Sequence, residues 1–335
     1  MKRLLLTGGT GFIGSRLALE ARRQQLDVVV TGLVKTEAEH ARMAQLGRAG
    51  VRVESGPLQD TEFARRVVDG CDTIIHLAAA QHESGMPDSY FIDVNVNGTQ
   101  SLLAASREAA VRRFVYGSTI GVYGSAAQGK LDESSPPNPD NIYGRSKLAA
   151  ERIVCEQGGN IETCVVRISE TYGPGDFRLL KLFRAIDRGK FLMIGSGENQ
   201  RQAMHVDDLV RALLLVAAHA AAPGETFVLP GEEVLTTRQM VDVIAGVLGR
   251  SVSRIRLPMW PFVAAAIAFE AVFKPFGIDP PLHRRRLDFF RKSFVFSTDK
   301  AQRLLGFRPQ VSFQDGARDT AEWYGRQGLL GRPAR

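Results

Sequence analysis

The chain has 335 residues, 44% of them hydrophobic, which is enough to bury a large core in one big α/β unit or in two coupled domains. Its 43 basic and 36 acidic side chains leave a net charge of +7, a modest excess that suits anionic ligands such as phosphates. No long basic run with interleaved aromatic residues occurs, so the composition argues against a nucleic-acid-binding protein.

Short apolar runs alternate with segments of helical period through the first half of the chain. The expected strands and the helices that follow them are "RLLLTG" and 12–24, "DVVVTG" and 37–46, "VRVE" and 61–68, "DTIIHLAA" and 89–109, "RRFVYGS" and 142–155, then the strand "ETCVVRI". This alternation predicts right-handed βαβ units and a parallel sheet covered on both faces. The predicted fold class is α/β, a Rossmann-type doubly wound parallel sheet with a smaller mixed C-terminal substrate domain.

The rhythm loosens after "YGPGD" at 172–176, where shorter helical segments are interrupted by prolines. We expect a dinucleotide-binding Rossmann domain at 1–172 plus about 204–230. A substrate-binding domain is expected at 173–203 and 231–330.

One apolar segment, "WPFVAAAIAFEAVF" at 260–273, has only fourteen residues and contains Glu270, so it is too short to span a membrane. Together with the basic run "HRRR" at 283–286 it could make a peripheral membrane contact. The preferred interpretation is a buried helix that lines a pocket.

The cysteines and the first residues bear on the compartment. Cys71, Cys155 and Cys164 are scattered, without CxxC or Cys/His metal spacing, which predicts packing residues, a reducing compartment and no bound metal. The chain starts directly with a strand-like segment instead of a signal peptide. We therefore expect a cytoplasmic protein.

The stretch "TGGTGFIG" at 7–14 lies between the first strand and the first helix. Glycines let the backbone turn tightly and approach a pyrophosphate, whose charge then lies against the free amides of the helix N-terminus. The loop predicts binding of NAD or NADP through Gly8, Thr10, Gly11, Phe12, Ile13 and Gly14.

The end of the second strand bears on the choice between the two cofactors. "DVVVTGLVK" has Thr31 and Gly32 where an acidic residue would hold the adenosine ribose. That gap, with Lys35 nearby, slightly favours NADP, whose 2′-phosphate it would admit. The alternative is that Lys35 is a solvated loop lysine and that NAD binds without the carboxylate.

The stretch "NIYGRSKLAAE" at 141–151 begins an expected helix and contains Tyr143 and Lys147. Residues four apart lie on the same helical face, so the phenol and the ammonium can approach each other. By itself this spacing is also that of an ordinary surface pair.

Eight motifs in order make the sequence resemble the extended short-chain dehydrogenase/reductase superfamily, in particular its NAD-dependent epimerase/dehydratase family and its 3β-hydroxysteroid-dehydrogenase-like branch. They are "TGGTGFIG" (7–14), "DTIIHLAA" (72–79), "DVNVNGT" (93–99), "YGSTIGVYG" (116–124), "YGRSK" (143–147), "RISETYGPGD" (167–176), "MHVDDLVRAL" (204–213) and "AQRLLGFRP" (301–309). The resemblance implies an NAD(P)-dependent oxidoreductase or epimerase.

The resemblance also implies residue roles. Tyr143 would exchange a proton with a substrate hydroxyl, Lys147 would lower the pKa of Tyr143 and hold the nicotinamide ribose, and Thr119 would hydrogen-bond the reacting oxygen. Further cofactor contacts would be Leu58 against adenine, then Leu77, Ala78, Ala79 and Asn95. The candidates for substrate binding are Ser118, which is also the alternative hydroxyl, and Gln81, Glu170 and Arg201.

The sequence disfavours only some of the reactions that this superfamily catalyses. The sugar 4,6-dehydratases of the superfamily carry an Asp and Glu pair where this chain has Ile120 and Gly121, which cannot move protons, so dehydration is disfavoured. Epimerase, ketoreductase and dehydrogenase share the same Thr, Tyr and Lys, and the sequence does not separate them. Arg201 suits a diphosphate, whereas Glu170 would repel one.

Three functions therefore stay open. The first is a nucleotide-sugar epimerase or ketoreductase. The second is a 3β-hydroxysteroid-dehydrogenase-like enzyme of an apolar alcohol, which the apolar stretch at 257–281 favours. The third is a catalytically silent dinucleotide-sensing protein. The resemblance further implies a homodimer, formed through the 89–109 helix and the helix that carries Tyr143.

Overall fold

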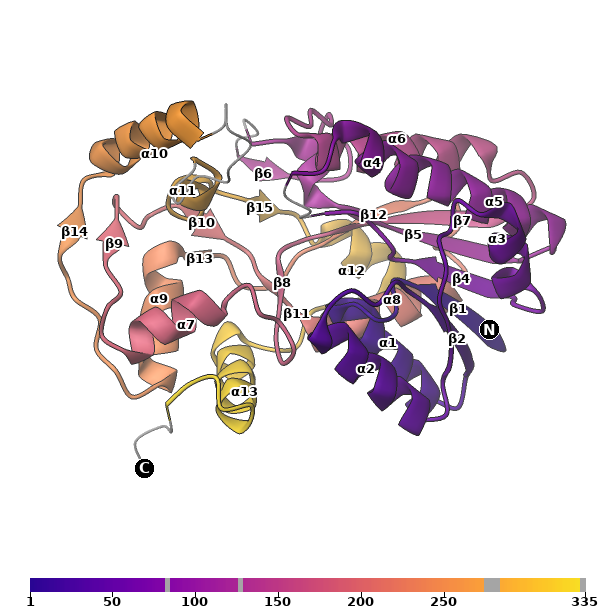
Figure 1. Cartoon of the computed structure of the whole chain (residues 1–335), viewed down its shortest axis with the longest axis horizontal. Helices are drawn as coiled ribbons and strands as arrows, with labels where there is room; N and C mark the ends of the chain where they lie inside the picture. Colours follow the sequence, from indigo (N-terminus) through magenta and orange to yellow (C-terminus); the bar gives the residue numbers. More distant parts are fainter. Residues whose placement is uncertain (82–84, 126–128, 274–283, 332–335) are drawn as a thin grey trace.

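A seven-stranded parallel sheet forms the centre of the larger part of the molecule (Figure 1). The computed structural model describes residues 1–81, 85–125, 129–273 and 284–331. The sheet has the order β12-β7-β5-β4-β1-β2-β3. Its strands are β1 (Arg3–Thr7), β2 (Asp27–Thr31), β3 (Arg52–Glu54), β4 (Thr73–His76), β5 (Arg113–Thr119), β7 (Glu162–Ile168) and β12 (Thr226–Leu229).

Helices cover both faces of this sheet because successive residues of a strand point to opposite faces and are apolar on both. Leu4 and Leu6 of β1 point into one core with helices α1 (Phe12–Arg23), α2 (Glu37–Arg48), α8 (Val206–Ala218) and α12 (Asp299–Leu305). Leu5 points into the other core with α3 (Thr61–Val68), α5 (Gly98–Glu108) and α6 (Ile142–Gln157). Strands buried on both faces are typical of doubly wound proteins, and the predicted fold class is confirmed.

The predicted helix 89–109 is interrupted. It consists of α4 (Asp88–Ile92), the π-helical turn η1 (Asp93–Asn97) and α5. Asn95 in this turn is buried, and its amide bonds both backbone groups of Ala80 and the hydroxyl of Ser146. Single π turns often occur at functional sites, and this one directs a polar side chain to the loop after β4.

The second half adds a smaller mixed layer around a core of its own, which includes Phe183, Ile244 and Tyr324. Its helices are α7 (Leu180–Asp187), α9 (Thr237–Val247), α10 (Met259–Phe273), α11 (Arg284–Arg291) and α13 (Phe313–Arg326). The short strands pair as β8 (Thr171–Tyr172) with β11 (Met204–His205), β9 (Met193–Ile194) with β14 (Arg256–Leu257), β10 (Gln200–Arg201) with β13 (Leu235–Thr236), and β6 (Lys130–Leu131) with β15 (Val295–Phe296). The exact domain boundaries stay a prediction.

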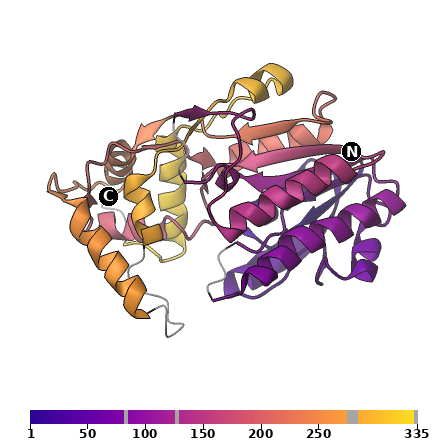
Figure 2. The same ribbon diagram turned by 90° about the horizontal axis from the view of Figure 1, so that it is seen from above.

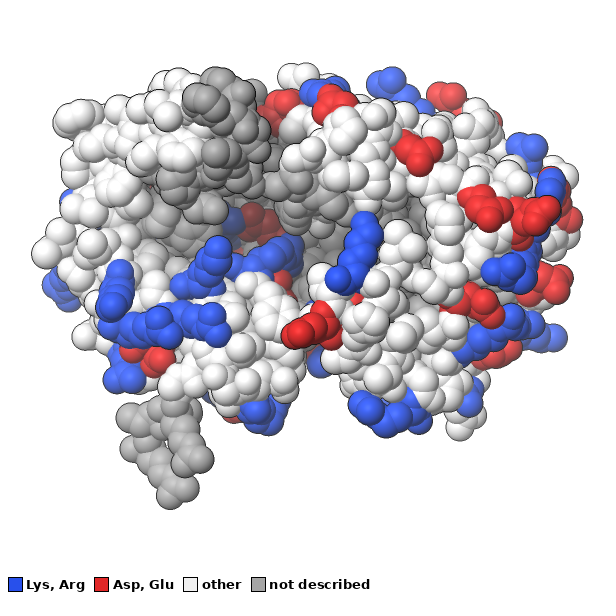
Figure 3. Space-filling model, in the orientation of Figure 1, with Lys and Arg blue, Asp and Glu red and all other residues white. Residues whose placement is uncertain are grey.

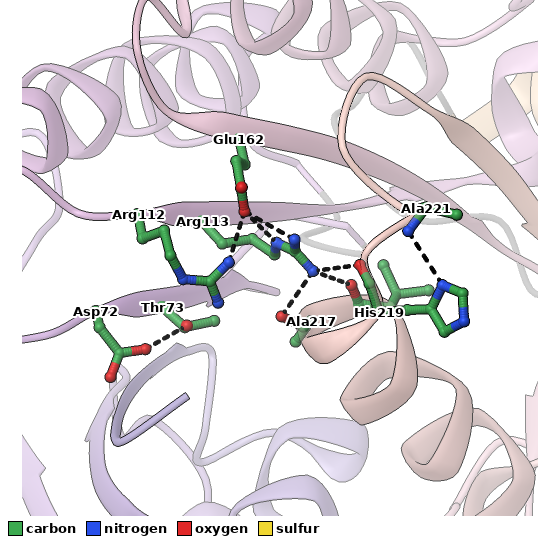
Figure 4. Close-up of polar contacts among 9 residues, drawn as sticks. Asp72, Thr73, Arg112, Arg113, Glu162, Ala217, His219 and Ala221 are labelled. Carbon is green, nitrogen blue, oxygen red and sulfur yellow. Dashed lines mark hydrogen bonds and ion pairs between the residues drawn. The ribbon is translucent and has the colours of Figure 1, made fainter.

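Arg113 anchors helix α8 to the sheet at the end opposite the carboxyl ends of the strands (Figure 4). Its guanidinium, which is 2% exposed, donates to the carbonyls of Val216, Ala217 and His219 at the C-terminus of α8. It also pairs with Glu162 at 2.7 Å. A cation here satisfies carbonyls that the helix leaves unpaired and favours the negative end of its dipole.

Two burial predictions are wrong in part. Cys71 and Cys164 are buried as packing residues, but Cys155 is exposed, since it lies on the outer side of α6. The helix α10 was expected to be buried, yet Ala266 is its only buried residue among those described, because it lies at the edge of the molecule (Figure 2). The basic run 283–286 lies outside the residues whose side chains the structure describes. Over the described ranges no helix is both long and apolar enough to cross a membrane.

Candidate active site

A cavity of about 480 Å³ opens at the carboxyl ends of β1 and β4, where the strand order of the sheet reverses. In doubly wound sheets ligands bind in the crevice at this switch point. Figure 3 shows the hollow between the two parts of the molecule, with Lys and Arg side chains along its rim. The predicted residues on its lining are Gly8, Thr10, Gly11, Phe12, Ile13, Gly14, Lys35, Leu77, Ala78, Ala79, Gln81, Ser118, Thr119, Tyr143 and Lys147.

The glycine loop is shaped so that side chains cannot replace its glycines. Gly8 has a φ of +68°, and a Cβ there would lie 2.7 Å from the nitrogen of Ala78. A Cβ on Gly14 would lie 2.3 Å from the carbonyl oxygen of Gly8. The loop therefore packs directly against the strand end and the first turn of α1.

The N-terminus of α1 keeps its amides available. The side chains of Thr36 and Asp60 accept amide hydrogen bonds at the starts of α2 and α3, whereas Gly11 at the start of α1 makes no such bond. No acidic residue occurs in the first turn of α1. Free amides at the positive end of a helix dipole suit a pyrophosphate, so the loop fits a dinucleotide.

Replacing Gly14 with alanine is expected to weaken NAD binding by about tenfold or more, equivalent to about 1.4 kcal/mol, because the new Cβ must push the loop away from α1. Isothermal titration calorimetry with NAD measures the change. The matched control is Gly47→Ala in α2, where a Cβ meets nothing within 4 Å, and it should leave affinity unchanged. Equal affinities of both variants and the wild type would contradict this role of the loop.

The cavity rim near the end of β2 is not the open gap that the missing acidic residue suggested, because charged side chains occupy it. The ammonium of Lys35 donates to the hydroxyl of Tyr90 at 2.9 Å, and Arg42 donates to the carbonyl of Gly175. Glu39 also lines the cavity, and its carboxylate accepts the amides of Lys35 and Thr36. The sequence motif missed this acidic group because it comes from α2, several residues after the strand.

Two predicted cofactor residues do not line the cavity. Leu58 is 8% exposed and packs in the core between the sheet and helices α3 and α5. Its expected contact with adenine stays a prediction. Asn95 lies behind the lining, where it holds the loop at Ala80 against Ser146 of the helix α6.

Thr119, Tyr143 and Lys147 share one wall of the cavity. Thr119 ends β5, while Asn141 caps α6 by accepting the amide of Gly144, which places Tyr143 and Lys147 on the first two turns. Thr119 hydrogen-bonds Tyr143 and accepts the amide of Gly121 at 3.0 Å. The ammonium of Lys147 lies 4.1 Å from the ring centre of Tyr116.

The ionisation of this pair differs from the expectation. Burial raises the pKa of Tyr143 to about 12, although the hydrogen bond with Thr119 and the charge of Arg178 oppose the rise. The predicted depression of the Tyr143 pKa by Lys147 is therefore wrong for the protein alone. Burial lowers the pKa of Lys147 to about 7, and the charge of Glu151 opposes that fall. Desolvation outweighs the nearby charges in both cases.

A buried ion pair lies behind this wall. Glu151, four residues after Lys147 on α6, pairs with Arg167 of β7 at 2.9 Å, and both side chains are less than a tenth exposed. Ser118 donates to the same carboxylate, and Arg167 also donates to the hydroxyl of Tyr123. Because the hydroxyl of Ser118 is hydrogen-bonded to Glu151, Thr119 provides the hydroxyl beside Tyr143. Glu151 lies in the same short motif as the pair, but its partner is remote in sequence.

Glu170 and Arg201 lie together in an adjoining cavity of about 160 Å³, which shares Thr171, Asp176 and Arg178 with the larger one. The carboxylate of Glu170 pairs with the guanidinium of Arg201. Arg201 also donates to the carbonyl of Phe289 and lies 4.6 Å from the centre of its ring. The two residues that were expected to have opposite effects on a diphosphate thus neutralise each other.

Comparisons with known proteins agree with this geometry. The model of the NAD dependent epimerase/dehydratase family matches residues 4–229. A dTDP-glucose 4,6-dehydratase of Streptomyces griseus is 32% identical, over 96% of this chain and 93% of that protein. The crystal structure of DesIV, a dTDP-glucose 4,6-dehydratase from Streptomyces venezuelae with NAD and TYD bound, matches with a TM-score of 0.76 and 30% identity, over 99% of this chain and 100% of that one.

A UDP-glucuronic acid 4-epimerase from Bacillus cereus, in complex with NAD, matches with a TM-score of 0.79 over 97% of this chain and 99% of that one. Its sequence identity of 21% means that this likeness shows the fold alone.

Proposed function

Because the chain belongs to the NAD dependent epimerase/dehydratase family, we propose that it is an NAD-linked epimerase or ketoreductase of a nucleotide-linked sugar, acting at a secondary alcohol or ketone. The observation that carries the proposal is the convergence of Thr119, Tyr143 and Lys147 with the glycine loop on one cavity. A catalytically silent sensor would not need this set of proton-handling groups.

The residues divide the work of the reaction. A bound nicotinamide supplies the site that accepts or returns a hydride. Tyr143 is protonated at neutral pH, so it is suited to give its proton to a ketone oxygen, and the reverse reaction returns that proton to the phenolate. Thr119 positions Tyr143 relative to the reacting oxygen. The pKa of Lys147, about 7, is close to neutral pH, so its charge responds to nearby groups.

We favour NAD over NADP. Glu39 on the cavity rim would repel a 2′-phosphate, and Lys35 is engaged with Tyr90. DesIV, the solved relative that is 30% identical, has NAD bound. The slight preference for NADP suggested by the missing carboxylate after β2 has no support from the comparisons.

We favour a reaction without loss of water, although dehydratases are among the relatives. The short 3₁₀ helix after β5 (Ile120–Tyr123) begins with Ile120 and Gly121, neither of which can donate or accept a proton. The relatives' names support a sugar nucleotide as substrate.

The neutralised Glu170–Arg201 pair favours the second candidate, an apolar alcohol, because it leaves Arg201 less available to a diphosphate.

The test is to denature the purified protein and identify any released nucleotide by chromatography and mass spectrometry. We expect NAD in the supernatant, because an epimerase recycles its hydride internally and keeps its cofactor. We also expect no dehydrated product from dTDP-glucose. A protein without nucleotide that oxidises NADPH when ketones are added would contradict the epimerase and support a reductase.

A further inference from the structure

The helix α10 presents large apolar side chains to solvent. Its 15 residues contain one ionisable side chain, Glu270. Trp260 is 74% exposed, Val272 58% and Ile267 51%, and Ile255 in the preceding segment is 64% exposed. Contiguous exposed apolar surface of this kind marks an interaction site. None of these side chains takes part in the cavity described above.

The exposed apolar residues form one continuous face. At 3.6 residues per turn, one strip of the helix carries five exposed residues: Trp260, Ala264, Ile267, Ala268 and Ala271. Val272 flanks this strip, which is about 18 Å long at 1.5 Å per residue. Glu270 is half-buried and projects about 100° away from Ala271, toward the side of Met259 and Ala266, so none of the five residues of the strip is charged.

The surroundings of this strip are basic. Arg254 and Arg256 are exposed immediately before α10, and within the described ranges neither forms a salt bridge. Between Asp242 and Glu270 the sequence contains three arginines and no acidic residue. An apolar strip with exposed cations in the segment that leads into it has a complement that is both apolar and anionic.

We propose that the α10 strip, with Arg254 and Arg256, docks the protein on an anionic membrane surface, with α10 lying in the plane of the lipid headgroups. Trp260 suits the boundary between acyl chains and headgroups, since its ring is apolar and its N–H is polar. At 15 residues α10 is too short to cross the bilayer, so the contact is peripheral. This inference does not depend on the proposed reaction.

The position and charge of the strip favour lipid over a second copy of the chain. The two ribbon views place α10 at the outer edge of the smaller layer, away from the large sheet (Figures 1 and 2). Two copies that met through the same strip would bring their arginines together without a carboxylate between them. Anionic headgroups supply the missing negative charge.

The experiment is flotation of the full-length protein with vesicles of phosphatidylcholine alone or mixed with phosphatidylglycerol. We expect the wild type to float with the mixed vesicles, and less so at high salt because the arginine contribution is screened. In the double variant Trp260→Ser/Ile267→Ser the fraction of protein that floats should fall about tenfold or more, since the substitutions remove the largest apolar groups of the strip. Arg254→Gln/Arg256→Gln should reduce both binding and its salt dependence.

The control is Val234→Ser, which removes an apolar side chain that is 39% exposed away from the strip, and it should float like the wild type. Circular dichroism and NAD binding verify that each variant is folded. Flotation of the double variant equal to that of the wild type, or no flotation of the wild type, would overturn the proposal. A third result would also overturn it: the wild type does not bind vesicles, and the double variant changes its oligomeric state. That result would assign the strip to a contact with a second copy of the chain.

Discussion

Replacing Tyr143 with phenylalanine is expected to lower kcat by about 100- to 10,000-fold, the range that positioned acid–base groups supply. The substitution removes only the phenolic oxygen, which hydrogen-bonds Thr119 at the wall of the cavity. The ring stays, so NAD affinity should change little. Steady-state kinetics with the identified substrate and calorimetry with NAD measure the two effects separately.

The matched control is Tyr324→Phe, which removes a hydroxyl from the core of the smaller layer, where it donates to the carbonyl of Asp176 at 2.7 Å. It should cost stability, by about 1 kcal/mol, and leave most of the turnover. If Tyr143→Phe kept its turnover, the acid–base assignment would be wrong. If it lost turnover together with NAD binding, the residue would be a cofactor contact instead.

Replacing Glu151 with glutamine is expected to lower the free energy of unfolding by about 3–5 kcal/mol, because it leaves the buried guanidinium of Arg167 without its counter-charge. Ser118 also loses a charged acceptor. Chemical denaturation measures the loss. The control is Glu108→Gln, which breaks a bidentate pair with Arg65 whose two side chains are more than half exposed and should not change stability measurably.

The same variant should change the pH dependence of the reaction. Burial lowers the pKa of Lys147 to about 7, and Glu151 is the charge that opposes this fall. Without it the lysine loses its proton at lower pH. The alkaline decline of kcat/KM should therefore move to lower pH in Glu151→Gln, a shift that a purely structural role would not produce. An unchanged profile in a folded variant would show that Glu151 acts on stability alone.

The sequence by itself determined the fold class and the family. Both depend on local patterns: the alternation of apolar runs with helical periods predicts strands that alternate with helices, and "TGGTGFIG" between a strand and a helix predicts a glycine-rich phosphate loop. The spacing of Tyr143 and Lys147 is equally local, because both lie on the first turns of α6. Such features need no information from remote parts of the chain.

Only the tertiary structure decided which groups meet and which are buried. The Glu151–Arg167 pair, the commitment of Ser118 to Glu151 and the neutralisation of Arg201 by Glu170 each join different elements. The same holds for burial: Leu58 is enclosed by α3 and α5, while most of the described apolar side chains of α10 stay partly or fully exposed. Hydrophobicity states what a side chain prefers, but burial and ionisation depend on the neighbours that the fold brings to it.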